Sequence, residues 1–225
     1  KEGQILFIDE IHSLKPLIEE MLYTAIEDFA IDLVIGKGPA AKSMRLKLPK
    51  FTLIGATTKI SKIASPLRDR FGVIFRLDFY NIDEVTEIID RSAMVLGLQI
   101  EKTAAKRLAL SSRQTPRIAN RLLKRVADLA LVNNKAIIDL ITVNQCLKNL
   151  GIDEKGLDRH DRSILEVIIE KFGGGPVGLS TLATAVSEEI GTIEDFYEPY
   201  LLQLGLMERT SRGRVVTEHA YQHLK

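Results

Sequence analysis

Two short apolar runs, each ending in polar side chains, constrain the fold of the N-terminal third most strongly. Residues 4–9 read QILFID and residues 51–57 read FTLIGAT. Uninterrupted apolar runs of this length are typical of strands covered on both faces, as in a parallel sheet. Between them, residues 17–29 carry apolar side chains at helical spacing after Pro16, which suits an early helical position. This order predicts an α/β domain with a parallel sheet.

A hairpin and a further strand are expected in the same region. Residues 31–35 and 44–48 flank GKGPAAKS, a connection that contains glycine and proline, so they predict a hairpin. Residues 73–77, VIFRL, predict another strand.

The next zone, residues 81–151, has helical periodicity throughout. Asn81 or Asp83 is expected to cap its first helix, and Thr115 a later helix that begins at Pro116. We therefore expect a first domain at 1–80 and a helical second domain at 81–151.

The last zone, residues 152–225, follows the acidic, glycine-punctuated stretch 151–158. It predicts three helices, two of them capped by Ser180 and Thr192, and then a two-stranded ribbon around RTSRGR. Three helices and a basic ribbon are the outline of a winged helix, so this zone is expected to be the third domain.

The composition excludes several classes of protein. The single cysteine, Cys146, rules out a disulfide framework, and no Cys/His spacing resembles a zinc site. A reducing compartment, most naturally the cytoplasm, is therefore expected. No apolar run approaches the roughly 18 residues of a membrane-spanning helix, and the N-terminus lacks the order of a signal peptide. We expect no membrane role.

The net charge of +1 is unevenly distributed. Residues 1–80 carry 12 basic and 10 acidic side chains, residues 81–151 carry 11 and 7, and residues 152–225 carry 8 and 13. Because the last domain is acidic overall, any contact with DNA must come from local clusters of basic residues.

Two adjacent carboxylates at the end of the first strand give the strongest chemical signal. Asp9 can hold Mg²⁺ through water, and Glu10 can polarise a water for attack on a γ-phosphate, which is the Walker B arrangement. The alternative is an acidic pair that only caps a helix. Thr57 and Thr58 end the second strand and lie beside the carboxylates if the strands are neighbours. A hydroxyl there can orient the water, or belong to a threonine-rich turn.

Two arginines add to this signal. Arg70, in SPLRDRFG, can stabilise transition-state charge on a neighbouring subunit's nucleotide as an arginine finger, or form a surface salt bridge with Asp69. Arg117 lies in the first turn of a predicted helix, where the backbone dipole and the guanidinium both favour an anion.

Together these segments resemble the RuvB family of bacterial Holliday-junction branch-migration ATPases. The resemblance runs nearly end to end and is carried by LFIDEIHSL, IGKGPAAKSMRLKLPKFTLIGATT, SPLRDRFG, TPRIANRLL, FGGGPVGLSTLA, TIEDFYEPYL and RTSRGR. It implies an α/β fold made of a partial AAA+ P-loop NTPase core, a helical lid domain and a C-terminal winged-helix domain. It also implies ATP and Mg²⁺, a homo-hexamer on duplex and Holliday-junction DNA, RuvA as partner, RuvC as a further candidate partner, and a role in recombination and repair.

The resemblance assigns roles to individual residues by matching position. It gives Asp9 and Glu10 to Walker B, with Asp9 at the metal, Thr58 to sensor 1, Arg70 to the arginine finger and Arg117 to sensor 2. The resemblance also implies that Arg70 and Arg117 lie near the nucleotide, together with four further residues: Glu27, Asp28, Phe29 and Tyr80. Phe29 and Tyr80 can equally be core aromatics.

The resemblance also implies contacts with DNA and with RuvA. It favours Arg209 and Arg214 as phosphate contacts, and Arg212 joins them because alternate residues of a strand share a face. A solvated turn is the alternative. The hairpin is implied to grip RuvA through Leu33, Ile35 and Met44, which could instead pack on the hairpin's own core.

Three features depart from the family pattern. The 225 residues hold no GxxxxGK[ST] phosphate loop, which by the resemblance would precede Lys1. These residues alone are therefore expected to bind nucleotide poorly and to lack ATPase activity. Gln114 stands where glycine is usual before TPR, and Ile190 stands where relatives can carry a DNA-contacting arginine.

Three other kinds of protein share parts of this pattern. A replication initiator has the same architecture but lacks the family-specific segments. A clamp-loader relative is expected to lack the C-terminal domain. A non-enzymatic DNA-binding regulator with an AAA+ scaffold has no reason to keep the polar set of Asp9, Glu10, Thr58, Arg70 and Arg117.

Overall fold

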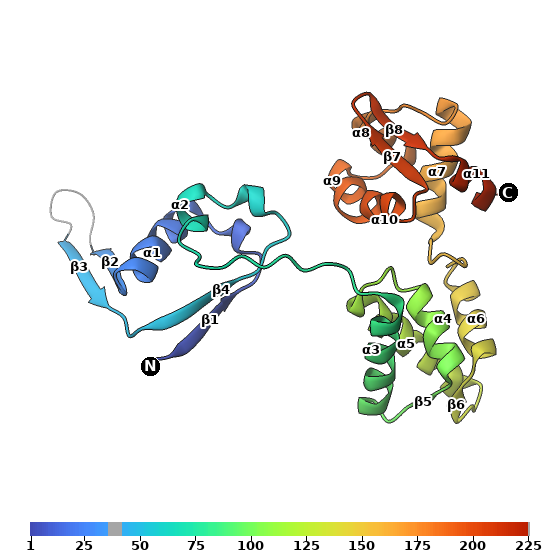
Figure 1. The fold of residues 1–225 in the computed structure, drawn as a ribbon, viewed down its shortest axis with the longest axis horizontal. Helices are drawn as coiled ribbons and strands as arrows, with labels where there is room; N and C mark the ends of the chain where they lie inside the picture. Colours follow the sequence, from blue (N-terminus) through green and yellow to red (C-terminus); the bar gives the residue numbers. More distant parts are fainter. Residues whose placement is uncertain (36–41, 225) are drawn as a thin grey trace. The chain divides into compact units, whose positions relative to one another are not determined.

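The computed structural model describes residues 1–35 and 42–224, apart from the side chains of Val34, Ile35 and Lys42. The chain forms two compact units, Lys1–Leu77 and Asp78–Lys225 (Figure 1). Among the described residues, the first unit has one cluster of buried apolar side chains, and the second has two. Among the described helices, none is both long and apolar enough to cross a bilayer.

The first unit is a small α/β arrangement. Its elements are β1 (Gln4–Ile8), η1 (Ile11–Ser13), α1 (Pro16–Glu27), β2 (Ala30–Ile35), β3 (Lys42–Lys47), β4 (Phe51–Gly55), η3 (Ile60–Lys62) and α2 (Ser65–Arg68). β1 and β4 pair in parallel, with Ile8 opposite Gly55, so the predicted parallel arrangement is confirmed and the two strands are neighbours. Ile11 and Leu67 are fully buried at the centre of this unit's core.

The two strands are less covered than the sequence predicts. Ile5 is 66% exposed and Phe7 is 59% exposed, so the expectation of strands buried on both faces is wrong for the described residues. The physical reason is that these residues form a sheet of only two strands, with too few other side chains in the unit to cover both faces.

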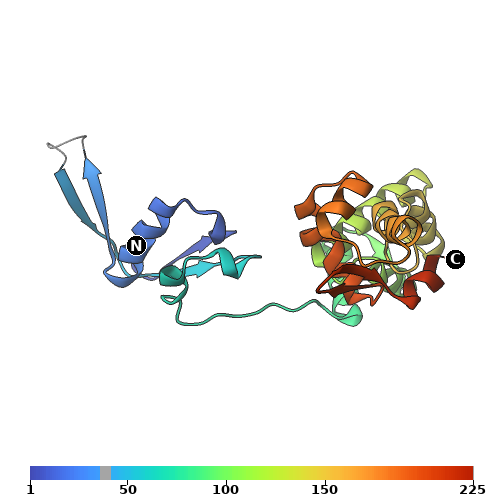
Figure 2. The same ribbon diagram turned by 90° about the horizontal axis from the view of Figure 1, so that it is seen from above.

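The predicted hairpin is present as β2 and β3. The two strands pair antiparallel, with Leu33 opposite Met44. In both views the hairpin projects away from the rest of its unit (Figures 1 and 2). Residues 36–41 of its connection lie outside the described residues.

The strand predicted at 73–77 is wrong. The segment has no strand structure, and Phe75 and Leu77 are 82% and 93% exposed. An apolar segment becomes a strand only where a neighbour pairs with its backbone N–H and C=O groups. Among the described strands, none pairs with residues 73–77.

The helical region of the second unit follows the predicted periodicity. Its elements are α3 (Ile82–Val95), β5 (Gln99–Ile100), α4 (Lys102–Leu110), α5 (Pro116–Val132), β6 (Ile137–Ile138) and α6 (Leu140–Asn149). Their apolar stripes meet in one core, in which Ile89, Leu108 and Leu123 are fully buried. Of the two expected caps, Asn81 and Asp83, it is Asn81 that caps α3, and it does so in a reciprocal capping box with Glu84.

The cap predicted at Thr115 is wrong in its chemistry. Thr115 precedes α5 as expected, but its side chain caps no N–H of that helix. Instead its hydroxyl donates to the carbonyls of Ser112 and Arg113, at 3.0 and 3.1 Å. The tight turn before α5 places these two carbonyl oxygens close to the hydroxyl, so the hydroxyl donates to them and not toward the helix.

The C-terminal region has the predicted helices and ribbon. Its elements are α7 (Arg159–Phe172), α8 (Leu179–Val186), α9 (Ile190–Thr192), the π-helix η4 (Ile193–Tyr197), α10 (Glu198–Gln203), β7 (Met207–Thr210), β8 (Gly213–Val216) and α11 (Glu218–Leu224). Ser180 is not a cap, since it lies inside α8 and the N-cap position is Gly178. Thr192 directly precedes η4 in a helical conformation, but its side chain caps no N–H. Leu179 and Ile193 pack on the domain core, and this packing overrides the local capping preference.

The ribbon is held, next to its turn, against the segment that precedes α8. Arg209 lies opposite Arg214 in the antiparallel pair, and the backbones of Arg214 and Val177 exchange hydrogen bonds at 2.8 and 3.0 Å. Gly213 has φ +138°, and a Cβ there would overlap the carbonyl of Val177. The glycine therefore allows this close approach of the backbones.

Candidate functional site

The carboxyl ends of β1 and β4 bring together the polar residues that follow each strand. Asp9 and Glu10 follow β1, and Thr57 and Thr58 follow β4. Thr58 donates to Oε2 of Glu10 from its hydroxyl at 3.2 Å and from its backbone N–H at 3.4 Å. The parallel pairing thus places a threonine hydroxyl directly on the acidic side chain.

His12 belongs to the same cluster. Its Nδ1 lies 2.8 Å from the hydroxyl oxygen of Thr57 and 3.1 Å from Oε2 of Glu10. Glu10 has a left-handed backbone, φ 47°, and the η1 turn follows it at once. This tight turn folds His12 back onto Glu10, and the signal in the sequence was that only Ile11 separates these two residues.

Asp9 has the chemistry of a single magnesium ligand. Its carboxylate is exposed, and Oδ1 accepts the backbone N–H of Glu10 at 3.0 Å. Mg²⁺ commonly takes one or two carboxylates together with water and phosphate oxygens. Across residues 1–35 and 42–224, no group of three or more His, Cys, Asp and Glu is arranged to hold a metal ion. An ion at Asp9 would therefore depend on water and phosphate for most of its ligands.

Arg70 is held in a defined orientation at the end of α2. Its Nε lies 2.9 Å from Oε1 of Glu27, and its Nη1 donates to the carbonyl of Pro66 at 2.5 Å. The guanidinium also lies over the ring of Tyr23, 5.0 Å from the centroid. The salt-bridge partner is thus Glu27, not the Asp69 suggested by proximity in sequence, and the structure joins two of the residues expected near a nucleotide.

The other residues expected near a nucleotide have separate surroundings. Asp28 accepts from Arg45 at 2.5 Å, and Phe29 packs edge-on against Phe51 with ring centroids 6.1 Å apart. Tyr80 is 45% exposed and, like the exposed Arg117 in the first turn of α5, belongs to the second unit. The first unit alone therefore assembles the cluster around Glu10.

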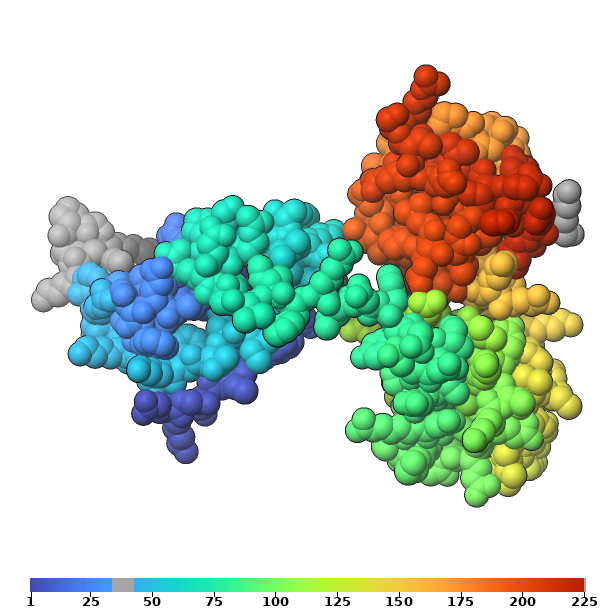
Figure 3. Space-filling model, in the orientation of Figure 1, coloured from blue at the N-terminus to red at the C-terminus, as the bar shows by residue number. Residues whose placement is uncertain are grey.

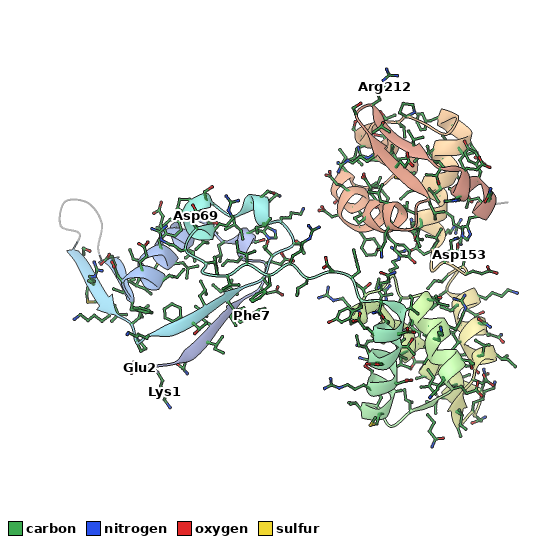
Figure 4. The ribbon with its side chains drawn as sticks, in the orientation of Figure 1. Lys1, Glu2, Phe7, Asp69, Asp153 and Arg212 are labelled. Carbon is green, nitrogen blue, oxygen red and sulfur yellow. The ribbon has the colours of Figure 1, made fainter. Side chains whose placement is uncertain are left out.

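The three ribbon arginines differ sharply in their surroundings. Arg214 is buried and donates from Nε and Nη2 to Oε2 of Glu198. Arg209 is half exposed, and its Nη2 lies 2.8 Å from Glu194. Arg212 lies in the turn between the strands, and its side chain points away from the domain (Figure 4). In the space-filling view the tip of the ribbon stands clear of the domain (Figure 3).

This arrangement changes what can be expected of Arg214. A direct phosphate contact by Arg214 would require its buried pair with Glu198 to open, so the predicted contact is unfavourable at this position. Glu194 and Glu198 were not singled out from sequence. Their position in the acidic segment TIEDFYEPYL, next to a basic ribbon in an overall acidic domain, was the available signal.

One face of the hairpin is apolar. Leu33 pairs with Met44 and Ile31 pairs with Leu46 across the strands, and alternate residues of a strand share a face. Met44 and Leu46 are 47% and 48% exposed, so the face is not buried in its own unit. The side chain of Ile35, also expected at a partner interface, lies outside the described residues.

Three family profiles together cover the chain almost completely. Residues 1–77 match the Holliday junction DNA helicase RuvB P-loop domain, residues 80–153 match the RuvB AAA lid domain, and residues 154–225 match the RuvB C-terminal winged helix domain. These matches confirm the predicted fold class.

Solved structures of RuvB from Thermotoga maritima are similar to the whole chain. Two point mutants of that protein are 49% and 48% identical, with TM-scores of 0.86 and 0.87. A third structure, described as a Holliday junction branch migration motor, is 48% identical with a TM-score of 0.84. Each match covers 100% of this chain and 70% of the Thermotoga chain.

Proposed function

The chain belongs to the RuvB family of Holliday junction branch-migration motors, and on that premise we propose that it is an ATPase subunit that drives branch migration as a homo-hexameric ring. The family's P-loop domain implies nucleotide binding. The observation that supports the catalytic part is the contact of Thr58 with Glu10 at the carboxyl ends of two parallel strands.

Glu10 is the proposed base that polarises the attacking water. Ligands of open α/β sheets bind at the carboxyl ends of the strands, where Glu10 lies. Thr58 and His12 both contact Oε2 of Glu10, so they would fix the direction of the carboxylate before the water arrives. When bound, Mg²⁺ supplies charge neutralisation at the phosphates, and Asp9 would hold it through water.

Arg70 is the proposed arginine finger and Arg117 the proposed sensor 2. Arg70 is oriented by Glu27 and Tyr23, and an oriented guanidinium at a subunit edge can stabilise charge on a neighbour's nucleotide. Glu27, Asp28, Phe29 and Tyr80 are proposed to lie near the nucleotide. Rings that mix Arg70→Ala subunits with Glu10→Gln subunits should hydrolyse more ATP than rings of either variant alone, because some interfaces then pair an intact Arg70 with an intact Glu10. If mixed rings show no such recovery, Arg70 does not act in trans.

The winged helix is the proposed DNA-contacting domain. Arg209 and Arg212 are the favoured phosphate contacts, because their side chains are outside the core. The proposed partners are Holliday-junction and duplex DNA and RuvA, with RuvC as a further candidate. The proposed setting is recombination and DNA repair in the cytoplasm, and the apolar face of the hairpin supports docking to RuvA.

The decisive experiment changes Glu10 to glutamine in the full-length protein, with Glu20→Gln on the exposed side of α1 as the matched control. The Glu10 variant should bind ATP but hydrolyse it at least about a hundredfold more slowly, because the amide keeps the shape and loses the base. Normal hydrolysis by the Glu10 variant would overturn the assignment. A protein made of these 225 residues alone should show no appreciable turnover, because they contain no phosphate loop.

A further inference from the structure

The turn between α4 and α5 carries a side chain into the winged helix. Arg113 and Gln114 both have left-handed backbones, with φ +52° and +53°. Left-handed conformations are uncommon for residues other than glycine, and two in succession persist only when the surrounding contacts favour them. Gln114 accepts from Nε2 of Gln203, at the end of α10, at 2.5 Å. The turn is therefore shaped to face the winged helix.

The guanidinium of Arg113 is enclosed by groups of the winged helix. Its Nη2 donates to Oδ2 of Asp158, at 3.0 Å, and to Oδ2 of Asp161 at the start of α7. Its Cζ lies 5.1 Å from the ring centroids of both Phe196 and Tyr200. A planar, weakly hydrated cation suits a site of two aromatic rings and two carboxylates, which an ammonium group does not match.

The chain that connects the two regions is held from both sides. From α4, Arg107 donates to the carbonyls of Asp153 and Glu154, at 3.3 and 3.4 Å. From α7, Arg162 donates to the carbonyl of Gly151 at 2.8 Å. In Figure 4, Asp153 lies in this connection. Because side chains satisfy its carbonyls, the connection does not behave as a free linker.

We propose that Arg113 fastens the winged helix to the lid, so that the two move as one rigid body and a displacement of the lid during ATP turnover reaches the DNA-contacting ribbon. Arg113 is a positioning residue in this scheme, since it acts through the domain it holds. The mechanical consequence rests on the proposed motor function, whereas the rigid attachment rests on the contacts of Arg113 alone.

The attachment can be measured directly in the full-length protein. Cys146 is buried, so within these 225 residues the cysteines introduced as Glu87→Cys on α3 and Glu208→Cys on β7, both exposed, should take spin labels selectively; any cysteine elsewhere in the full-length protein is replaced by serine. The distance distribution between the labels should be narrow in the parent and at least about twofold broader after Arg113→Ala. Arg125→Ala, which removes an exposed arginine paired with Asp128 on α5, is the matched control and should leave it narrow. An equally narrow distribution after Arg113→Ala would overturn the proposal.

A second set of measurements separates attachment from motor activity. Arg113→Ala should retain ATP hydrolysis and DNA binding within about threefold, while branch migration falls at least about tenfold. Arg113→Lys should recover only part of the loss, because lysine lacks the planar fork. Equal losses in hydrolysis and migration would show a general structural role and reject the coupling. If the parent protein itself shows no branch migration, the proposed function is wrong. The distance measurement still tests whether Arg113 holds the winged helix on the lid.

The aromatic contact provides a variant with little risk of unfolding. Phe196 is 48% exposed, so Phe196→Ala should keep the domain folded while it removes one ring over Arg113. It should broaden the distance distribution less than Arg113→Ala does. If Arg113→Ala does not fold, Phe196→Ala decides the question alone. A distance distribution as narrow in Phe196→Ala as in the parent would then reject the proposed attachment.

Discussion

Arg214 donates from both Nε and Nη2 to one carboxylate oxygen of Glu198, at 3.2 and 2.8 Å. Glu198 is only 2% exposed, and its other oxygen lies 3.5 Å from Nε of Arg209. One buried carboxylate therefore joins the arginines of both ribbon strands. Because Arg214 is buried in this pair and Arg209 is exposed, the two arginines should respond differently to replacement.

Arg214→Ala should destabilise the winged helix without acting mainly on DNA. It removes both hydrogen bonds to Oε2 of Glu198 and leaves the buried carboxylate with only the longer contact to Arg209. Breaking a buried ion pair typically costs about 3–5 kcal/mol. Arg212→Ala should keep stability within about 0.5 kcal/mol and reduce the salt dependence of DNA binding by about one phosphate contact. Urea unfolding and DNA titrations at several salt concentrations check both. Unchanged stability of Arg214→Ala together with weakened DNA binding would reverse these assignments.

Glu194 should restrain the DNA affinity of the ribbon. Its Oε1 lies 2.8 Å from Nη2 of Arg209, so a phosphate must displace it to reach the guanidinium. Exposed ion pairs of this kind contribute about 1 kcal/mol or less. Glu194→Gln should therefore tighten binding to any duplex by about two- to fivefold. Glu170→Gln on α7 makes the same change in net charge and should alter binding less. If the two variants change DNA affinity equally, the effect comes from the net charge of the domain and not from the ion pair between Glu194 and Arg209.

The sequence predicted the elements that depend on local periodicity and on chain order. The hairpin and the cap at Asn81 were predictable because each follows from spacing within a short segment, and the parallel direction of β1 and β4 was predictable from the order of the elements between them. The caps at Thr115 and Thr192 were not, since hydroxyl groups have several local backbone partners and core packing decides between them. The strand at 73–77 failed because a strand requires a partner that the segment itself does not contain.

The candidate site was predicted in its residues more than in its contacts. Asp9, Glu10 and Thr58 could be paired from the order of strands, because parallel strands end at the same edge. The partner of Arg70 is Glu27, more than forty residues earlier in the chain, and no local pattern indicates it. Arg214 was expected at the surface because alternation along a strand does not reveal which face the helices cover.

His12 should set the rate of ATP hydrolysis through the position of Glu10. It lies within 3.1 Å of both Thr57 and Glu10, and a misplaced catalytic group can lower a rate by about tenfold to a hundredfold. In the full-length protein, His12→Ala should lower kcat by about tenfold with KM within about twofold. His12→Asn keeps a polar atom near the position of Nδ1 and should recover part of kcat. A change in KM alone would place His12 in nucleotide binding.

The apolar face of the hairpin should carry the affinity for RuvA. Met44 is 47% exposed opposite Leu33, and a charge at the centre of an apolar contact leaves it buried without a partner. Met44→Asp should therefore weaken RuvA binding by at least about tenfold. Ser43→Asp introduces the same charge on the opposite face and is the matched control. If both variants bind RuvA like the parent and fold normally, the hairpin is not part of the interface.

Asp161 gives the winged-helix attachment a dependence on pH. The side chain is fully buried, and burial raises the pKa of its carboxyl to about 7, against the opposing charge of Arg113 and the N–H of Asp158. The side chain of Asp158 also raises this pKa, and Tyr197 and Tyr200 are further titratable groups that interact with Asp161. The folded protein therefore holds a proton on Asp161 at pH values where the unfolded chain has lost it.

The sign of the resulting effect on stability follows from that difference in pKa. Because the folded pKa lies above the usual value of 3.8, the contribution of Asp161 to stability is complete below about pH 4 and is lost as the pH rises to about 7. Asp161→Asn stays neutral, and its amide oxygen can still accept from Arg113 and from the N–H of Asp158. The melting temperature of the parent should therefore fall relative to Asp161→Asn between about pH 4 and about pH 7, and the gap should then stay constant. Thermal unfolding of both proteins across this range measures the gap. A parent that instead gains stability over the variant as the pH rises would mean that Arg113 outweighs burial and holds Asp161 ionised.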